Sequence, residues 1–223
     1  MNERTLKHTD TEDIEDLLGK VESSFGITFS DGELIHIKTF GELCDHVTNK
    51  IQLDNADDCT TQQAFYKLRN AITETLKIES KDISPDSLLL NLLPRRSRRT
   101  IVNGIEKQLG FKISILRPPT WIMVILAIIL ITSFIELFFN GRVGVCGLLF
   151  SFAGLWVANK VGKELDLKTV GEVAEKMKSE YYLQSRRNSK TFNKQEIEKA
   201  LTELFSNGLC IDKSELTRNA ELV

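Results

Sequence analysis

KTFGELCDHV at residues 38–47 and KTVGEVAEKM at residues 168–177 share one pattern, and they lie on opposite sides of the most hydrophobic part of the chain. Lys, Thr, Gly and Glu occupy the same positions in both stretches, and the apolar residues keep the same spacing. Internal similarity of this kind is typical of a repeated structural unit.

Two further pairs of segments match in the same way. Residues 64–89 align without a gap with residues 197–222, and residues 13–29 align with residues 98–113. In the second pair, apolar residues recur every four positions, which is helical spacing, and a glycine follows each run as a helix-ending signal. The repeats therefore predict an all-α protein.

The three repeated pieces resemble parts of the acyl carrier protein family, which are small four-helix domains. KIESKDISPDSLLLNLL resembles the long loop after that family's first helix, VESSFGITF and IEKQLGFKI resemble the end of its second helix, and KTVGE resembles the start of its last helix. The resemblance implies that residues 10–53 supply helices two to four of a carrier-like unit, which residues 194–223 complete with helix one. It implies a second unit from residues 61–113 with 164–178.

The middle of the chain predicts a transmembrane hairpin at residues 119–161. WIMVILAIILITSFIELFF, residues 121–139, contains one ionisable residue and as a helix would span about 28 Å, close to the hydrocarbon core of a bilayer. Asn140-Gly141-Arg142 predicts a turn before a second apolar run. A buried hairpin of a soluble protein is the alternative, but two such runs are hard to hide in so small a chain.

The charges around this hairpin predict its orientation. Arginines and lysines precede the first span and follow the second, whereas Arg142 is alone in the turn. This bias places both termini in the cytoplasm of a multi-pass inner-membrane protein. Trp121 and Trp156 would then both lie at the cytoplasmic interface, where indole rings are favoured.

One face of the second span carries small side chains at helical spacing: Gly147, Ser151, Gly154 and Ala158. Such a stripe lets another helix approach closely. The first span is the expected partner, and a second copy of the protein, giving a homo-oligomer, is the alternative.

Carrier proteins attach phosphopantetheine to a serine at the start of helix two. When residues are counted back from the end of helix two, the position of that serine falls on Thr11 in the first unit and on Arg95 in the second. The nearest serine of the second unit, Ser97, lies two residues after this position. Neither sequence is the Asp-Ser-Leu motif of the family. The favoured expectation is therefore no cofactor, with a carrier modified at Ser97 or Thr11 as the alternative.

Four arginines, Arg95, Arg96, Arg98 and Arg99, replace the acidic residues that carrier domains usually present at this helix. Near a membrane span they are expected to contact the anionic surface of the bilayer. A topology signal or a solvated helix start is the alternative reading. A net charge of −2 and the few aromatic residues beside the arginines argue against a nucleic-acid partner.

No pattern predicts catalysis or metal binding. The histidines are isolated, the four cysteines are scattered, and no glycine-rich phosphate loop is present. The expected function is a non-enzymatic, membrane-anchored scaffold or docking protein. The resemblance implies a partner among enzymes of acyl-chain or natural-product assembly. A structural membrane protein that oligomerises through its glycine-rich helix is a further alternative.

Overall fold

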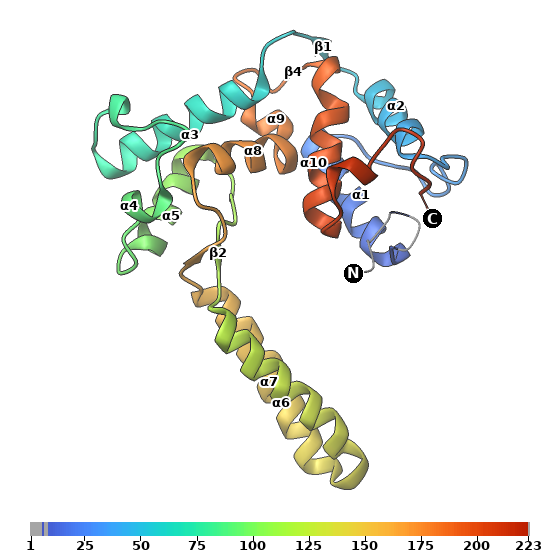
Figure 1. Ribbon diagram of the computed structural model, residues 1–223, viewed down its shortest axis with the longest axis vertical. Coiled ribbons are helices and arrows are strands. Elements are labelled where there is room, and N and C mark those ends of the chain that lie inside the picture. The colour runs from blue at the N-terminus through green and yellow to red at the C-terminus, as the bar shows by residue number, and fades with distance from the viewer. Residues whose placement is uncertain (1–5, 7–8, 223) are drawn as a thin grey trace.

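The computed structural model describes residue 6 and residues 9–222, so Val223 of the expected C-terminal segment lies outside the described residues (Figure 1). The chain is mostly helical, which confirms the all-α expectation. The long helices are α1 (Thr11–Phe25), α2 (Phe40–Lys50), α3 (Thr60–Leu76), α5 (Arg98–Leu109), α6 (Thr120–Phe139), α7 (Gly141–Val161), α8 (Val170–Glu180) and α10 (Ile197–Leu209). Single turns are α4 (Leu89–Leu92), α9 (Tyr182–Ser185), η2 (Ser80–Asp82), η3 (Lys194–Glu196) and η4 (Lys213–Glu215), and the strands β1 (Asp54–Asn55), β2 (Leu116–Arg117), β3 (Glu164–Leu165) and β4 (Thr191–Phe192) have two residues each.

The first hydrophobic core joins the two ends of the chain. We call residues 10–53 and 194–222 unit A. Leu17, Val21 and Phe25 of α1 are buried together with Leu201 and Phe205 of α10. The ring of Phe205 also meets the ring of Phe40 at the start of α2, with centroids 5.3 Å apart. The apolar faces of the two segments cover each other, and Tyr182 of α9 also packs on Phe25, with ring centroids 5.1 Å apart.

The second core is built from the middle of the chain. We call residues 60–117 and 164–180 unit B. Helix α3 packs against α5 and α8, and the buried side chains include Leu68, Ile72, Ile105 and Val173. The apolar hairpin α6–α7 is inserted between the two pieces of this unit.

The two units share the same backbone contacts at equivalent positions. In unit A, Thr39 forms a β-bridge with Glu221, and the N–H groups of Phe40 and Gly41 donate to the carbonyls of Ala220 and Arg218. In unit B, Thr169 forms a β-bridge with Leu88, and the N–H groups of Val170 and Gly171 donate to the carbonyls of Ser87 and Pro85. All of these residues align in the sequence repeats. The units are therefore structural repeats, and the order of the pieces along the chain is permuted in unit A.

The repeated Lys-Thr-x-Gly-Glu phrase has a structural cause. Thr39 and Thr169 cap α2 and α8, because each side chain accepts a hydrogen bond from the backbone N–H of the glutamate three residues later. The glycine allows the loop to approach the helix, since a Cβ at Gly41 would lie 2.7 Å from the carbonyl oxygen of Arg218. The phrase thus encodes a helix start against which a loop of the same unit packs.

Buried polar contacts hold the two units together. The Ser24 hydroxyl of α1 donates to the Ser179 carbonyl and accepts from the Tyr182 N–H, both at 2.9 Å. Lys178 of α8 and Glu203 of α10 form a buried ion pair at 3.0 Å. Lys178 also pairs with Glu175 at 3.1 Å, so this cation joins two helices of different units.

Helices α6 and α7 project from the head formed by the two units as a long hairpin (Figure 1). Their mean hydropathies are 2.8 and 1.5, and only 11% and 17% of the residues in their most apolar 18-residue stretches are buried. Both helices are thus long and apolar enough to cross a membrane, and they are not core helices of the head. Strands β2 and β3 pair antiparallel where the hairpin joins unit B; we call these residues the neck.

The shared core of unit A predicts that a defect in α10 loosens α1. Phe205→Ala should lower the free energy of unfolding of unit A by about 3–5 kcal/mol, because it removes a fully buried ring. Hydrogen exchange on the full chain in detergent should then accelerate in α1 and change little in α3. Leu90→Ala, at a side chain that is 66% exposed, is the control. Unchanged protection of α1 in the Phe205 variant would contradict a shared core.

Candidate docking pocket and basic neck

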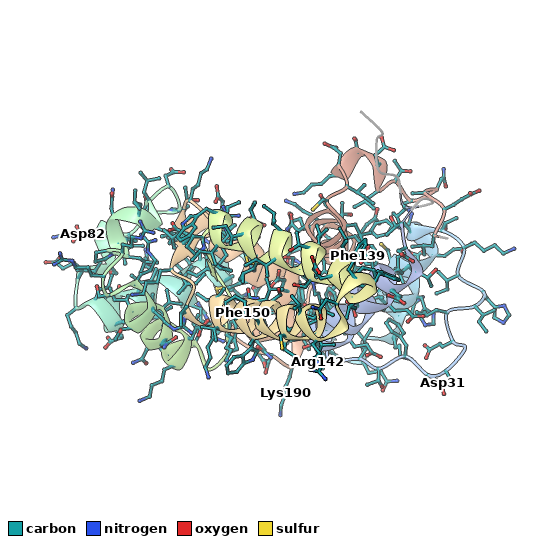
Figure 2. The ribbon with its side chains drawn as sticks, turned by 90° about the horizontal axis from the view of Figure 1, so that it is seen from below. Asp31, Asp82, Phe139, Arg142, Phe150 and Lys190 are labelled. Carbon is teal, nitrogen blue, oxygen red and sulfur yellow. The ribbon has the colours of Figure 1, made fainter. Side chains whose placement is uncertain are left out.

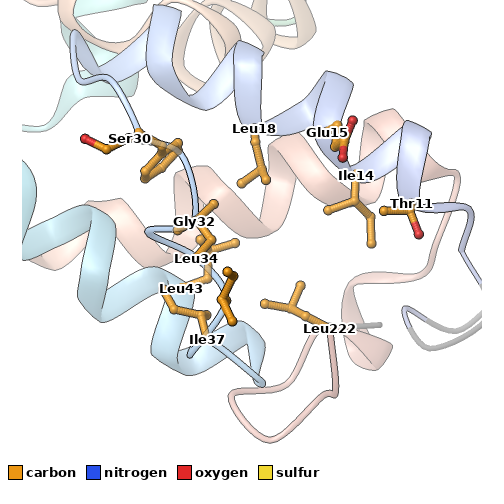
Figure 3. Close-up of a pocket in the computed structure, with 12 residues that line it drawn as sticks. Thr11, Ile14, Glu15, Leu18, Ser30, Gly32, Leu34, Ile37, Leu43 and Leu222 are labelled. Carbon is orange, nitrogen blue, oxygen red and sulfur yellow. The ribbon is translucent and has the colours of Figure 1, made fainter.

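An open apolar pocket of about 360 Å³ lies in unit A between α1, α2 and the loop that joins them. Ile14 and Leu18 of α1, Leu34 of the loop and Leu222 near the C-terminus all point into it (Figure 3). The loop has turns at residues 31–36 and no helix, so the third helix that the carrier resemblance implies is absent. Both ends of the described chain thus border one cavity.

The rim of the pocket is acidic. Thr11 and Glu15 line it, and Glu12, Asp13 and Asp16 are exposed on the same helix start. Carboxylates in the first turn also favour the helix, because they face the positive end of its dipole. An apolar cavity with a negative rim suits a partner that offers an apolar group surrounded by basic residues.

Glu33 fixes the loop that forms one wall of the pocket. Its carboxylate accepts hydrogen bonds from Lys50 Nζ at 2.5 and 2.6 Å and from the Ser30 N–H at 2.8 Å, and it lies 2.6 Å from His46 Nε2. The hydrogen bond from Lys50, followed by those from Ser30 and His46, lowers the pKa of Glu33 from 4.5 to about 2. The loop is therefore fastened to α2 by one carboxylate.

In unit B the equivalent space is filled. Leu89, Ile113 and Val173, which align with Leu222, Phe29 and Leu43 of the open pocket, enclose only about 10 Å³. Leu92 and Leu93 also line this small cavity. The pocket is thus not a general consequence of this fold, because the same fold packs it shut in the other repeat.

The charges at the start of α1 and α5 have opposite signs at equivalent positions. With Gly26 aligned on Gly110, Glu12 corresponds to Arg96 and Glu15 to Arg99. Both α1 residues and Arg96 are exposed, and Arg99 is half-buried. The same face of the repeated unit is therefore negative in unit A and positive in unit B.

Three of the four arginines are available at the surface, and the fourth corrects the expectation from sequence. Arg98 is 3% exposed, and its guanidinium donates to the Leu93 carbonyl at 2.8 Å and to the Lys163 carbonyl at 2.6 Å. It occupies the place of Ile14, inside the unit. Arg98 therefore fastens unit B to the neck and does not contact a membrane surface, whereas Arg95, Arg96 and Arg99 remain candidates for that contact.

The two candidate attachment residues lie in different surroundings. Ser97 is exposed in the turn at the start of α5, beside a unit whose cavity is filled. Thr11 is exposed at the start of α1 and its side chain borders the open pocket (Figure 3). Of the two hydroxyls, only that of Thr11 could carry a group into a cavity.

The small-residue stripe of α7 faces α6. A Cβ on Gly147 would lie 2.0 Å from Ser133 Oγ, and one on Gly154 would lie 2.7 Å from Leu126 Cδ2. Ser151 and Ala158 are buried in the same contact. The first apolar helix therefore covers this face, which leaves it closed to a second copy of the protein.

No arrangement for metal binding occurs in the described part of the chain, where no three His, Cys, Asp or Glu side chains come together. Figure 2 shows the head from the side of the hairpin, with Asp31 and Asp82 at opposite ends and Arg142 on the hairpin. The chain matches no protein-family model, no curated protein and no solved structure.

The Glu33 contacts predict an acid-sensitive loop. Since the folded-state pKa lies below the ordinary value, the stabilisation is complete above about pH 4.5 and is lost as the pH falls towards 2. Thermal unfolding of the purified protein should show a drop in melting temperature between pH 5 and pH 3 that is smaller in Glu33→Gln. Glu12→Gln, which removes an exposed carboxylate of the same unit, should behave as wild type. Equal drops in all three proteins would contradict this role.

Proposed function

We propose that the protein is a membrane-anchored, non-enzymatic docking protein whose unit A receives an apolar group of a partner with a basic surface. The single observation that carries this proposal is the pocket of about 360 Å³ in unit A, whereas the aligned residues Leu89, Ile113 and Val173 of unit B line a cavity of only about 10 Å³. An open apolar cavity with a charged rim is a usual form of binding site.

The resemblance to acyl carrier proteins suggests the class of partner. In such proteins the start of helix two meets basic partner enzymes, and here the equivalent start of α1 is acidic and adjoins the pocket. The proposed partner is therefore an enzyme that handles acyl chains or related natural products. The proposed role of the hairpin is to hold that enzyme at the membrane where its products are used.

The proposed location is the inner membrane, with both spans crossing it and both termini in the cytoplasm. Support comes from the length and exposure of α6 and α7 and from the basic residues at their head-proximal ends. Lys160 Nζ lies 4.7 Å from the centroid of the Trp156 ring, which places an indole and a cation together near the neck. Such pairs suit the lipid headgroup region.

The orientation can be tested at the hairpin tip. In a cysteine-free background, a cysteine in place of Asn140 should react with a membrane-impermeant thiol reagent in whole cells, because this turn is proposed to lie outside. Cysteines at residues 57 and 190 in the head should react only after the cells are opened. Labelling of the head in intact cells would reverse the proposed topology.

Docking can be tested by photo-crosslinking in living cells. A photoreactive phenylalanine in place of Ile35, which is 77% exposed at the pocket, should give a discrete adduct, whereas the same group at Tyr66 of unit B should not. Charge reversal by Glu15→Lys and Asp16→Lys should lower the yield at least about tenfold, because like charges repel at the rim.

The matched control for this experiment is Glu74→Lys with Glu79→Lys, which makes the same charge change on the exposed surface of unit B. The control should crosslink as the parent does. Identical adducts from positions 35 and 66, or equal losses from both pairs of charge reversals, would exclude a specific docking site in unit A.

A second candidate is a membrane-tethered carrier, which the position of the Thr11 hydroxyl at the pocket rim favours. A phosphopantetheine on Thr11 could extend along the apolar cavity, while Ser97 has no comparable space beside it. Intact mass after co-expression with a phosphopantetheinyl transferase separates the candidates. The mass gain of one phosphopantetheine, absent in Thr11→Val, would replace the non-enzymatic docking proposal by the carrier.

A further inference from the structure

The arginine-rich start of α5 is fastened to the foot of the hairpin. Arg95 Nη2 lies 2.5 Å from Glu164 Oε1, and the Arg98 guanidinium donates to the Lys163 carbonyl. Residues 163 and 164 follow directly on α7, which ends at Val161. The remaining arginines of this segment are therefore held beside the point where the apolar helices leave the head.

The positive charge at this place is only partly neutralised within the molecule. Arg95 and Arg117 have acidic partners, Glu164 and Asp166. Arg96, Arg99 and Lys163 form no ion pair with any described residue, and Arg96 and Lys163 are exposed. These three cations lie on two segments that the contacts of Arg95 and Arg98 join, and cations without an acidic partner there favour an anionic ligand from outside the protein.

The hairpin determines which anion can reach this place. Helix α6 has 20 residues and spans about 30 Å, so insertion of both helices brings the neck to the level of the headgroups. Trp121 and Trp156, at the neck-proximal ends of α6 and α7, are 64% and 65% exposed, as expected of residues at a membrane interface. The phosphates of the same lipid layer then lie at the level of residues 163 and 164, to which the arginine segment is bound.

We propose that Arg96, Arg99 and Lys163 bind the phosphate group of an anionic phospholipid at the foot of the hairpin. Arginine is suited to this role because its planar guanidinium can donate two hydrogen bonds to one phosphate. The inference rests on the proposed membrane insertion but not on the docking pocket. It assigns different ligands to equivalent faces of the two units: lipid to unit B, and a protein partner to unit A.

Native mass spectrometry of the full chain in neutral detergent tests this binding. Basic side chains near an anionic surface each favour binding about fivefold, so wild type should prefer phosphatidylglycerol over phosphatidylcholine by on the order of 100-fold. Arg96→Gln, Arg99→Gln and Lys163→Gln together should abolish most of that preference. Arg96→Lys with Arg99→Lys, which keeps the charge, should retain most of it.

The matched control is Arg187→Gln with Lys190→Gln and Lys194→Gln, which removes three exposed positive charges far along the chain from the neck. It should bind phosphatidylglycerol as wild type does. Equal weakening by both triple variants would show a net-charge effect and overturn the site. Displacement of the lipid by inorganic phosphate at millimolar concentration would show a free-anion site and overturn the lipid assignment.

Solubility without detergent and lipid preference separate a missing headgroup site from a missing membrane anchor. A protein that needs detergent for solubility but binds both lipids equally lacks the headgroup site while keeping its membrane anchor. A protein that stays soluble and monomeric without detergent lacks the anchor itself, and the headgroup site is then excluded with it. The crosslinking at Ile35 reports on unit A in either case.

Discussion

The contact between α1 and α10 is the constraint on which the architecture depends. Neither helix could persist alone, because isolated helices of this length are marginal in water and each has one apolar face. Burial of Leu17 and Phe25 against Leu201 and Phe205 therefore forces the two ends of the chain together. Unit B, which lies between these ends in sequence, is consequently held beside unit A and shares buried polar contacts with it.

The two repeats differ in the cavities that their aligned residues line in the described part of the chain. In unit B the loop from α3 to α5 is continuous, and its Leu92 and Leu93 pack into the space beneath α5. In unit A the corresponding pieces are not consecutive in the chain, and Leu222 and Thr11 at the start of α1 both line the pocket of about 360 Å³.

Sequence patterns were sufficient to predict the helices and the apolar hairpin. The period of an amphipathic helix, a glycine at a helix end and a long apolar run are all local signals. The match of the Lys-Thr-x-Gly-Glu phrases also indicated a repeated unit, and Thr39 and Thr169 make equivalent contacts in the two units. Burial of individual charged residues could not be predicted in this way. Arg98 belongs to an arginine run that is typical of a solvated surface, yet its guanidinium is buried and donates to the carbonyl of nearby Leu93 and to that of the distant Lys163.

The pocket could likewise not be predicted from the sequence. Its lining residues come from three separated segments, and several of them have the spacing of ordinary core residues. Arg186 is a similar case: it stands in a polar stretch, but it is buried and donates to the Thr60 hydroxyl at 2.6 Å and to the carbonyls of Ala56 and Asp58. Long-range hydrogen bonds of this kind depend on the packing of whole units, which no local pattern encodes.

The reversal of charge between the two units links fold to function. Equivalent positions on one fold, Glu12 and Arg96 or Glu15 and Arg99, have opposite signs, although neither unit needs a particular sign to form its core. Exposed charges contribute little to folding stability, so their pattern is better explained by what each face meets. A positive face fastened to the foot of an apolar hairpin suits lipid phosphate, and a negative face beside an open pocket suits a basic protein. A duplicated unit can thus hold itself against a membrane with one copy and offer the same face of the other copy to a partner.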